Sequence, residues 1–342
     1  MIQVEQHGPI TSIRMARSFL GKPLYWTTAY WVDGLLIDTG PRCAAPELVR
    51  ILQQVQVDQI VVTHGHEDTI GGLSTLAKQF PKATVYASQW TIPILEQPTL
   101  LRMQFYRRFT WGVPDAVNEV VSLDSISNEI VTPHHSFRVL ETPGHCRDHI
   151  SLFEPKNGWL FSGDAFIGGR ERSCTEEFDL LTSLGSLHTL VGLRPERLFP
   201  SSGVVRRAAI VEINEKITQL QGLAAEVARL EAAGMNVEQT VVELFKEEPP
   251  IRFWTQGHYS ATNLVNACRA YNALFTLTDP VPAVPLIDAE EDHSDDILSQ
   301  LKLDDIFANF DNNSTGSNSA GSKSSRKPPP GKESTDTEDH KR

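Results

Sequence analysis

The sequence predicts an α+β protein in which a strand-rich part is followed by a helical part. Up to residue 203, short apolar segments are separated by tight turns, which is typical of β-strands. Beyond residue 203, apolar residues recur at steps of three and four, which is typical of amphipathic helices. Polar residues follow several of the predicted strands. Because loops carry function on a rigid scaffold, we expect these residues to gather at one rim of a sheet.

Two hairpins dominate the strand-rich part, and the first of them turns at Asp33-Gly34. In chain order, the predicted elements are the hairpin 26–32 with 35–38, a strand over 59–62, a helix over 72–80, a strand over 84–87, a segment rich in helix formers over 92–110, a strand over 137–140, the hairpin 149–153 with 159–162, and a helix over 178–191.

The helical part contains three predicted helices. Apolar residues between Ile210 and Leu230 recur at helical steps, and this long helix is expected to end near Gly234. A second helix is predicted over 237–245 and a third over 264–274.

We therefore divide the chain into three predicted parts: a domain over 1–205, a helical extension over 206–280, and an acidic linker with a tail over 281–342. Residues 288–311 are acidic but carry apolar side chains, which leaves a protein partner for the tail open. Residues 312–342 have almost no apolar side chains. They cannot bury enough surface to offset the entropy of the chain, so we predict that they are disordered.

The segment 63–72, with the sequence THGHEDTIGG, is the strongest functional signal. His64 and His66 are two residues apart and Asp68 follows two residues later, directly after the predicted strand 59–62. In an extended turn, residues i and i+2 can direct two imidazoles at one point. Imidazoles and carboxylates are ligands of Zn²⁺. We therefore predict a metal site rather than a loop of solvated histidines.

Other segments place polar residues after predicted strands in the same way. His145 follows the strand 137–140 and a Pro-Gly turn. Asp164 follows the strand 159–162 and a glycine, and Asp38 ends the first hairpin. We expect these three side chains at the same rim as the histidine pair.

The segments 36–40, 63–68, 142–145 and 162–164 together resemble the metallo-β-lactamase superfamily in order and spacing, over residues 20–203. The resemblance implies a four-layer αββα sandwich, in which two mixed sheets pack face to face between outer helices. It also implies one or two metal ions at the rim.

The resemblance also implies roles for five residues. His64, His66 and His145 look like the three ligands of a first metal. Asp164 looks like the carboxylate that bridges to a second metal. Asp68 looks like a ligand of that second metal, or like the catalytic base that takes a proton from the metal-bound water.

Two positions depart from the family pattern. The family has a histidine where Thr69 stands, and a late histidine where Ser202 stands. Both losses fall on the second metal, because neutral hydroxyls are poor Zn²⁺ ligands compared with imidazole or carboxylate. We therefore predict one firmly held metal ion, with zinc as the first expectation and iron left open.

Five further residues are candidates for supporting the metal or holding substrate. Asp38 could orient a ligand imidazole or form a turn. His149 resembles a residue that supports the site in relatives. Arg170 and Arg172 could hold an anionic substrate group or be solvated. His258 could be a substitute ligand, a substrate contact or a histidine bonded within its own loop.

Charge and cysteine content narrow the class of protein. The chain has 342 residues and a formal net charge of −12, which argues against a general nucleic-acid binder. Local arginines such as Arg102 and Arg107 leave a local RNA contact open. Four cysteines without paired spacing indicate a reducing compartment, and Cys146 is interpreted as a buried packing residue. Without a secretory signal or a long apolar run, a cytoplasmic protein with no membrane contact is expected.

Three functions are compatible with these features. The first is a metal-dependent hydrolase, in which a metal-bound hydroxide attacks a small ester, thioester or lactone. The second is an iron enzyme resembling persulfide or thiol dioxygenases, with His64, His145 and Asp164 as ligands. The third is a non-catalytic descendant that serves as a binding module. The complete set of first-metal ligands favours the hydrolase.

Overall fold

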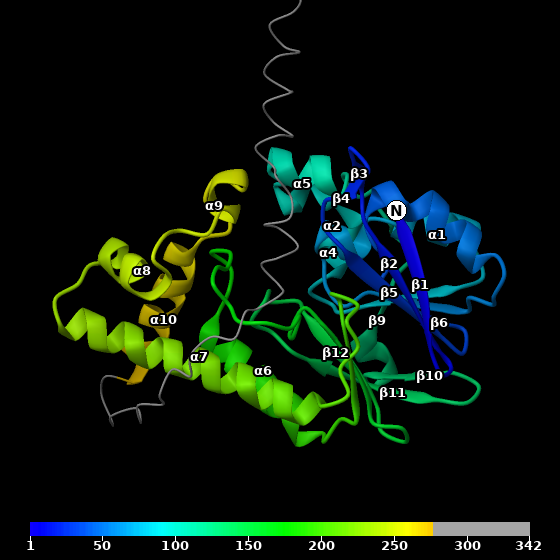
Figure 1. Ribbon diagram of the computed structural model, residues 1–342. Helices are drawn as coiled ribbons and strands as arrows, with labels where there is room; N and C mark the ends of the chain where they lie inside the picture. Colours follow the sequence, from blue (N-terminus) through cyan, green and yellow to red (C-terminus); the bar gives the residue numbers. More distant parts are fainter. Residues whose placement is uncertain (276–342) are drawn as a thin grey trace, which may run out of the picture. The chain divides into compact units, whose positions relative to one another are not determined.

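The computed structural model describes residues 1–275, which form two main β-sheets with helices on both outer sides (Figure 1). The first sheet has the strand order β1 (Ile2–His7), β2 (Ile10–Met15), β5 (Thr27–Val32), β6 (Leu35–Ile37), β7 (Gln59–Val61), β8 (Thr84–Ala87) and β9 (Val121–Ser122). The second sheet has the order β10 (Glu129–Val131), β11 (Ser136–Glu141), β12 (Ile150–Glu154), β13 (Trp159–Gly163) and β14 (Arg197–Pro200). Strands β3 (Ser18–Phe19) and β4 (Lys22–Pro23) form a small separate ribbon.

Both main sheets are mixed. Strands β1, β2, β5 and β6 run antiparallel, whereas β6, β7, β8 and β9 run parallel. In the second sheet only the pair β13 and β14 is parallel. The helices are α1 (Ala45–Leu52), α2 (Glu67–Ile70), α3 (Leu73–Gln79), α4 (Ile92–Glu96), α5 (Phe105–Thr110), α6 (Leu180–Gly192), α7 (Ala209–Ala232), α8 (Val237–Phe245), α9 (Ile251–Trp254) and α10 (Ala261–Phe275), with short 3₁₀ turns η1 (Arg42–Ala44), η2 (Pro98–Leu101) and η3 (Leu123–Ile126).

The first outer layer consists of helices α1 and α3. Leu48 of α1 and Leu76 of α3 are fully buried against Ile13, Leu36 and Ile60 of the first sheet. Buried positions in α1 recur at helical steps, so one face of the helix is apolar. Each such side chain contributes roughly 1.5–3 kcal/mol on burial.

The inner faces of the two sheets form the centre of the protein. Tyr30 and Ile37 of the first sheet are buried against Phe137, Phe161 and Phe199 of the second. The rings of Phe161 and Phe199 stack at 4.9 Å, and Tyr30 meets Phe161 edge-on at 5.4 Å. These aromatic side chains fix the spacing between the sheets.

The second outer layer consists of α6, α7 and α10. Leu184 of α6, Ile217 of α7 and Leu264 of α10 share one apolar cluster with Leu160 and Leu198 of the second sheet. The three clusters occupy three successive interfaces, helix to sheet, sheet to sheet and sheet to helix. The predicted four-layer αββα sandwich is therefore confirmed.

The segment 92–110 differs from the single helix-rich segment that was expected. It is divided into α4, η2 and α5. Pro98 begins η2 and has no N–H to continue the preceding helix. Arg102 then adopts a left-handed conformation with φ of 45°, which ends that turn. Strands β1 and β2 were not anticipated from the sequence.

The predicted long helix and its two successors correspond to α7, α8 and α10. Their buried residues belong to the same cluster as those of α6. The division into parts at residues 205 and 280 stays a prediction. The predicted linker and tail over 281–342 lie outside the described residues. Within residues 1–275, no helix is both long enough and apolar enough to span a bilayer.

Gly144, directly before His145, is required by its surroundings. Its φ is +138°, and an added Cβ would lie 2.5 Å from the Cα of Ser183 on α6. We expect Gly144→Ala to lower the free energy of unfolding by about 2–4 kcal/mol, because strain and overpacking add. Denaturant unfolding measures this change.

Gly185→Ala is the matched control, and Gly185 lies on α6, the same helix as Ser183. An added Cβ there meets no atom within 4 Å. Since alanine favours a helix interior, this variant should gain about 0.5–1 kcal/mol. Equal stability of the two variants would contradict the packing around Gly144.

Candidate metal centre

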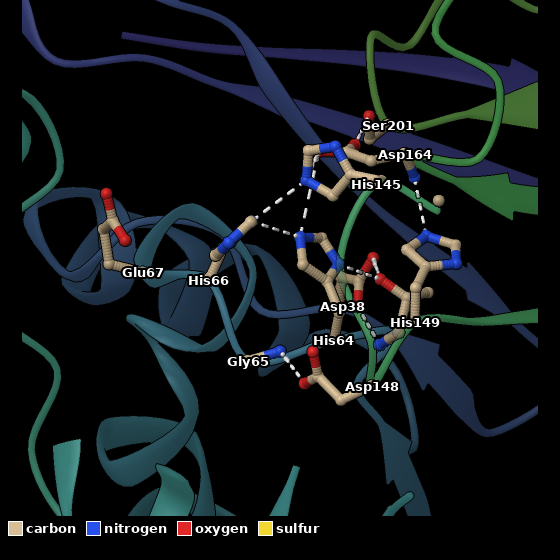
Figure 2. Close-up of polar contacts among 12 residues, drawn as sticks. Asp38, His64, Gly65, His66, Glu67, His145, Asp148, His149, Asp164 and Ser201 are labelled. Atoms are coloured by element: carbon tan, nitrogen blue, oxygen red, sulfur yellow. Dashed lines mark hydrogen bonds and ion pairs between the residues drawn. The ribbon is translucent and has the colours of Figure 1, made fainter. Parts of the chain in front are cut away.

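The polar residues named from the sequence lie on loops that leave neighbouring strands. The loop after β7 carries His64 and His66 and leads into α2. The turn after β11 carries His145, and Asp164 directly follows β13. Figure 2 shows these side chains directed toward one another.

Three histidine nitrogens meet at one point. His64 Nε2 and His66 Nδ1 are 3.0 Å apart, and His145 Nε2 is also 3.0 Å from His66 Nδ1. The Asp164 carboxylate lies 3.3 Å from His145 Nε2 and 3.8 Å from His64 Nε2 (Figure 2). Loops far apart in sequence therefore bring three imidazoles and one carboxylate together.

This donor set fits a single tetrahedral cation. With Zn²⁺ bonds of about 2.0–2.1 Å, two ligand atoms of a tetrahedral site stand about 3.3 Å apart. The distances of 3.0 Å and 3.3 Å between neighbouring donors are close to that value. Burial lowers the pKa of His64 and His66 well below the usual histidine value, and neighbouring imidazoles add to this effect. Neutral imidazoles have the lone pair that a metal requires.

Asp38 acts on His64 through Thr63. The Thr63 amide and hydroxyl donate to the two oxygens of the Asp38 carboxyl group, at 2.7 Å and 3.0 Å. Because the hydroxyl donates its hydrogen to Asp38, it accepts from His64 Nδ1 at 3.0 Å. His64 Nε2 is then free of hydrogen and faces the other histidines. The expected orienting role of Asp38 is thus indirect.

The pKa of Asp38 reflects two opposed effects. Burial raises it to about 8, and the hydrogen bonds from Thr63 oppose that rise. A cation bound at His64 would favour the ionised form of the Asp38 carboxyl group, which is linked to His64 through the Thr63 hydroxyl.

His149 supports Asp164, and both of its ring nitrogens are occupied. Nε2 accepts the backbone N–H of Asp164 at 2.9 Å, and Nδ1 lies 2.8 Å from the hydroxyl of Thr142. Gly163 permits this approach, since a Cβ there would lie 2.6 Å from His149 Nε2. Burial lowers the pKa of His149 well below its usual value, so the ring is a neutral acceptor.

Asp148 fixes the loop between the paired histidines. Its carboxylate accepts the backbone N–H of Gly65 at 2.8 Å (Figure 2). It also accepts the hydroxyl of Thr91 at 2.8 Å. The bond to Gly65 holds the peptide between His64 and His66, which keeps both imidazoles on one side of the turn.

Asp68 and Asp164 have pKa values displaced in opposite directions. Burial raises the pKa of Asp68 well above its usual value, and the Asp164 and Glu67 carboxylates raise it further. The pKa of Asp164 is lowered despite its burial, because His145 and the Ser201 hydroxyl favour its ionised form. Two neighbouring carboxylates therefore have different proton affinities.

The hydroxyl beside Asp164 belongs to Ser201 rather than to Ser202, the residue singled out from the sequence. Ser201 Oγ donates a short hydrogen bond to the Asp164 carboxylate (Figure 2). Ser202 Oγ is buried and has no hydrogen-bond partner among the described residues. The turn after β14 sets this register, which spacing in the sequence could not reveal. Thr69 is buried in α2, and its carbonyl accepts the Thr39 amide and hydroxyl.

Cys146 lies closer to the centre than the sequence suggested. Its sulfur and the ligand nitrogens of His64, His66 and His145 all lie within 4.8 Å of one another. The residue is buried, as expected, and burial raises the pKa of its thiol well above the usual value. Its position directly after His145 was the available signal.

A buried ion pair anchors the loop that carries His64 and His66 to α5. Arg107 Nε and Nη2 donate to the two oxygens of Glu67, at 2.6 Å and 2.5 Å. Glu67 is 1% exposed and Arg107 7% exposed. From the sequence, Arg107 is named only as a local contact for RNA. Its partner Glu67 lies 40 residues away in the chain, so no local sequence pattern pairs the two residues.

The remaining candidates are His258, Arg170 and Arg172. His258 Nδ1 is hydrogen-bonded to the Tyr106 hydroxyl at 2.7 Å. His258 is absent from the group of metal-binding donors found in residues 1–275. Arg170 and Arg172 are exposed in the loop after Asp164, and their role in holding substrate stays a prediction.

Comparisons with known proteins agree with the fold. The sequence pattern of the metallo-beta-lactamase superfamily matches residues 27–202. A protein named Beta-lactamase-like protein 2 homolog from Drosophila melanogaster is 28% identical over 246 residues, covering 67% of this chain and 76% of the relative. A hydroxyacylglutathione hydrolase from Legionella pneumophila (strain Corby) is 31% identical over 156 residues, covering 45% of this chain and 50% of the relative. The match thus spans about half the length of such hydrolases.

Solved structures show the same fold. A metallo-beta-lactamase family protein from Thermus thermophilus superposes with a TM-score of 0.58 and 18% identity, covering 79% of this chain and 96% of that one. A metallo-beta-lactamase from Pontibacter korlensis superposes with a TM-score of 0.50 and 18% identity, covering 65% of this chain and 99% of that one. At this identity the likeness concerns the fold alone.

The ion pair of Glu67 and Arg107 predicts a large loss of stability when only one partner is removed. Arg107→Met should lower the free energy of unfolding by about 3–5 kcal/mol, because a buried carboxylate loses its partner. The double variant Arg107→Met with Glu67→Leu should recover most of this loss. Denaturant unfolding of the set measures both values. Arg108→Met, at an exposed neighbour, is the control. A double variant as unstable as the single one would contradict the pairing.

His258 should remain neutral well below the usual histidine range. Burial, followed by the charge of Arg107, lowers its pKa from 6.5 to about 4. The unfolded chain binds the extra proton first, so this residue reduces stability as the pH falls from 6.5 toward 4. NMR titration of the imidazole signals should give a midpoint near 4. Tyr106→Phe should leave the midpoint low, since burial is the main cause. A midpoint at or above the ordinary value of 6.5 would contradict this environment.

Proposed function

Because the chain belongs to the metallo-β-lactamase superfamily, we propose that it is a metal-dependent hydrolase that holds one divalent cation and cleaves an acyl substrate. The bond cleaved would be an ester, thioester or lactone in a small molecule. The observation that carries the proposal is the convergence of His64, His66 and His145 nitrogens at 3.0 Å beside the Asp164 carboxylate.

The four donors would hold the cation, with a fifth coordination position left for water, and Zn²⁺ suits three imidazoles and a carboxylate. A bound divalent cation supplies Lewis acidity and can lower the pKa of water to about 7. The protein prepares this site in advance. Thr63 directs the lone pair of His64 inward, and His149 and Ser201 orient Asp164.

Asp68 is the candidate general base. Burial and the Asp164 carboxylate raise its pKa, which increases its affinity for a proton. A base is most effective when its pKa approaches the working pH. In the proposed reaction, an Asp68 carboxylate oxygen takes a proton from the attacking water while Asp164 stays ionised. The opposite pKa shifts of the two carboxylates support this division of roles.

The residues around Asp68 favour one cation over two. A second cation would need ligands beyond Asp68 and Asp164, and the two positions where the family has histidines carry Thr69 and Ser202, which offer only neutral hydroxyls. Hydroxyls bind Zn²⁺ more weakly than imidazoles do. Phosphodiester cleavage gains from two metals that clamp the reacting oxygens. A single cation therefore favours an acyl substrate, and the relatives named hydroxyacylglutathione hydrolase point the same way.

His66 should be essential for both metal binding and turnover. Its Nδ1 lies 3.0 Å from both other histidines, so His66→Ala removes the donor that they share. We expect the full-length protein to bind about one zinc per chain by elemental mass spectrometry, and the variant to lose most of it. Hydrolysis of thioesters should fall by a factor of at least about 10³, the scale of a lost catalytic electrostatic group.

His188→Ala is the control, because His188 is exposed on α6. It should keep the metal and the rate. Full activity of His66→Ala would overturn the ligand assignment. Iron with oxygen uptake would favour an oxidoreductase, and protein without metal or turnover would favour a binding module.

A further inference from the structure

Five aromatic side chains form a chain of contacts beside the metal centre, and we call them the aromatic collar: Tyr25, Tyr106, Trp111, His258 and Tyr259. Tyr25 and Trp111 meet edge-on at 5.6 Å, and Trp111 meets Tyr106 at 6.2 Å. Tyr106 is hydrogen-bonded to His258, whose ring lies 5.5 Å from that of Tyr259. All five side chains are partly exposed.

The collar is assembled from three distant parts of the chain. Tyr25 precedes β5, Tyr106 lies on α5, and Tyr259 lies between α9 and α10 (Figure 1). The hydrogen bond between Tyr106 and His258 joins α5 to the loop after α9. The helical extension thus contributes to the site and does not merely complete the core.

The collar is joined to the loop that carries His64, His66 and Asp68, because Arg107, next to Tyr106, donates two hydrogen bonds to Glu67, next to Asp68. Burial raises the pKa of Tyr25, and the Asp164 and Asp68 carboxylates raise it further. The pKa of Tyr259 is raised by burial, by Tyr25 and by the same two carboxylates. Both phenols therefore keep their hydrogen at neutral pH and can donate it.

The hydroxyls of Tyr25 and Tyr259 are available for a ligand. Neither makes a hydrogen bond to another residue within the range 1–275. Neither is among the polar atoms that are fully buried without a partner, so solvent can reach them. By contrast, the Tyr106 hydroxyl is already bonded to His258.

The collar has aromatic surface and hydroxyl donors, and the positive charge next to it is already paired. Arg107, next to Tyr106, donates through Nε and Nη2 to the two oxygens of Glu67. His258 is neutral, since its pKa is about 4. The five collar side chains therefore offer no charged group that would bind an anion. An uncharged aromatic ring could pack on them.

We propose that the aromatic collar binds the acyl part of the substrate and selects uncharged aromatic acyl groups. The rings of the collar pack on the ring of the acyl group, and Tyr25 and Tyr259 donate hydrogen bonds to an oxygen acceptor on it. This proposal rests on the proposed hydrolase function, because that function identifies the bound group as the acyl part of a substrate. Binding of an aromatic group to the collar does not require hydrolysis.

Three non-hydrolysable amides that share one amine test the selectivity. They are N-(2-acetamidoethyl)benzamide, the corresponding butanamide and the corresponding succinamic acid, which are aromatic, aliphatic and anionic. Binding to the full-length protein, with one equivalent of Zn²⁺ and without metal, is measured by titration calorimetry. We expect the benzamide to bind about tenfold more tightly than either other probe in both states, the upper range of a favourable aromatic contact. Equal binding of all three probes would overturn the proposal.

Conservative variants locate the binding. Tyr259→Phe and Tyr25→Phe keep the rings and remove one donor each, so each should weaken benzamide binding about fivefold. Tyr259→Leu removes a ring and should abolish the preference for the benzamide. Tyr271→Phe is the matched control, because Tyr271 lies on α10 against Phe275. Unchanged affinity in the two collar Phe variants would place the binding elsewhere.

The two proposals fail in different ways. The S-acyl-N-acetylcysteamine thioesters with benzoyl, butanoyl and succinyl groups are assayed in parallel. Tight benzamide binding that depends on the collar, without any thioester hydrolysis, would leave the collar and reject the hydrolase. If all three thioesters are hydrolysed at equal kcat/KM and all three amides bind equally, the proposed hydrolase function is supported and the proposed role of the collar is overturned.

Discussion

The rest of the centre is constrained by three imidazole nitrogens, of which His66 Nδ1 lies 3.0 Å from both His64 Nε2 and His145 Nε2. Nitrogen atoms with lone pairs directed at one another repel unless a cation or a proton lies between them. The protein holds them there with neighbouring groups. Asp148 fixes the peptide between the paired histidines, and Thr63 sets the hydrogen position on His64. The four-layer packing supplies the rigid strand ends from which these loops start.

The part of the centre around Asp68 is built differently from the part formed by the three histidines. At the two positions where the family has further histidines this chain has Thr69 and Ser202, and the neighbouring Ser201 hydroxyl binds Asp164 directly. Asp68 is left beside Asp164 with a raised pKa. In the proposed site with one cation, Asp68 is not engaged by a second metal, so its carboxylate can accept a proton. Phenols of Tyr25 and Tyr259 lie near the same carboxylates.

The helical extension connects fold and chemistry. Helices α7 and α10 pack on α6 and the second sheet, and the loop before α10 carries His258 and Tyr259. Its position is fixed from two sides, by the apolar cluster and by the bond from His258 to Tyr106 on α5. On the other side of α5, Arg107 is tied to Glu67 in the metal-binding loop. Helix α5 thus joins the metal loop to the extension.

The sequence by itself determined the class of fold and the residues that meet at the rim. Strand and helix periods predicted most elements, and the paired histidines with His145 and Asp164 predicted the donor set. These signals are local, since each depends on a few neighbouring residues. Only the tertiary structure decided that Ser201, not Ser202, contacts Asp164, that Cys146 lies beside the histidines, and that Arg107 is buried on Glu67. Those contacts depend on the register of turns and on packing between distant segments, and no local pattern in a single sequence records either.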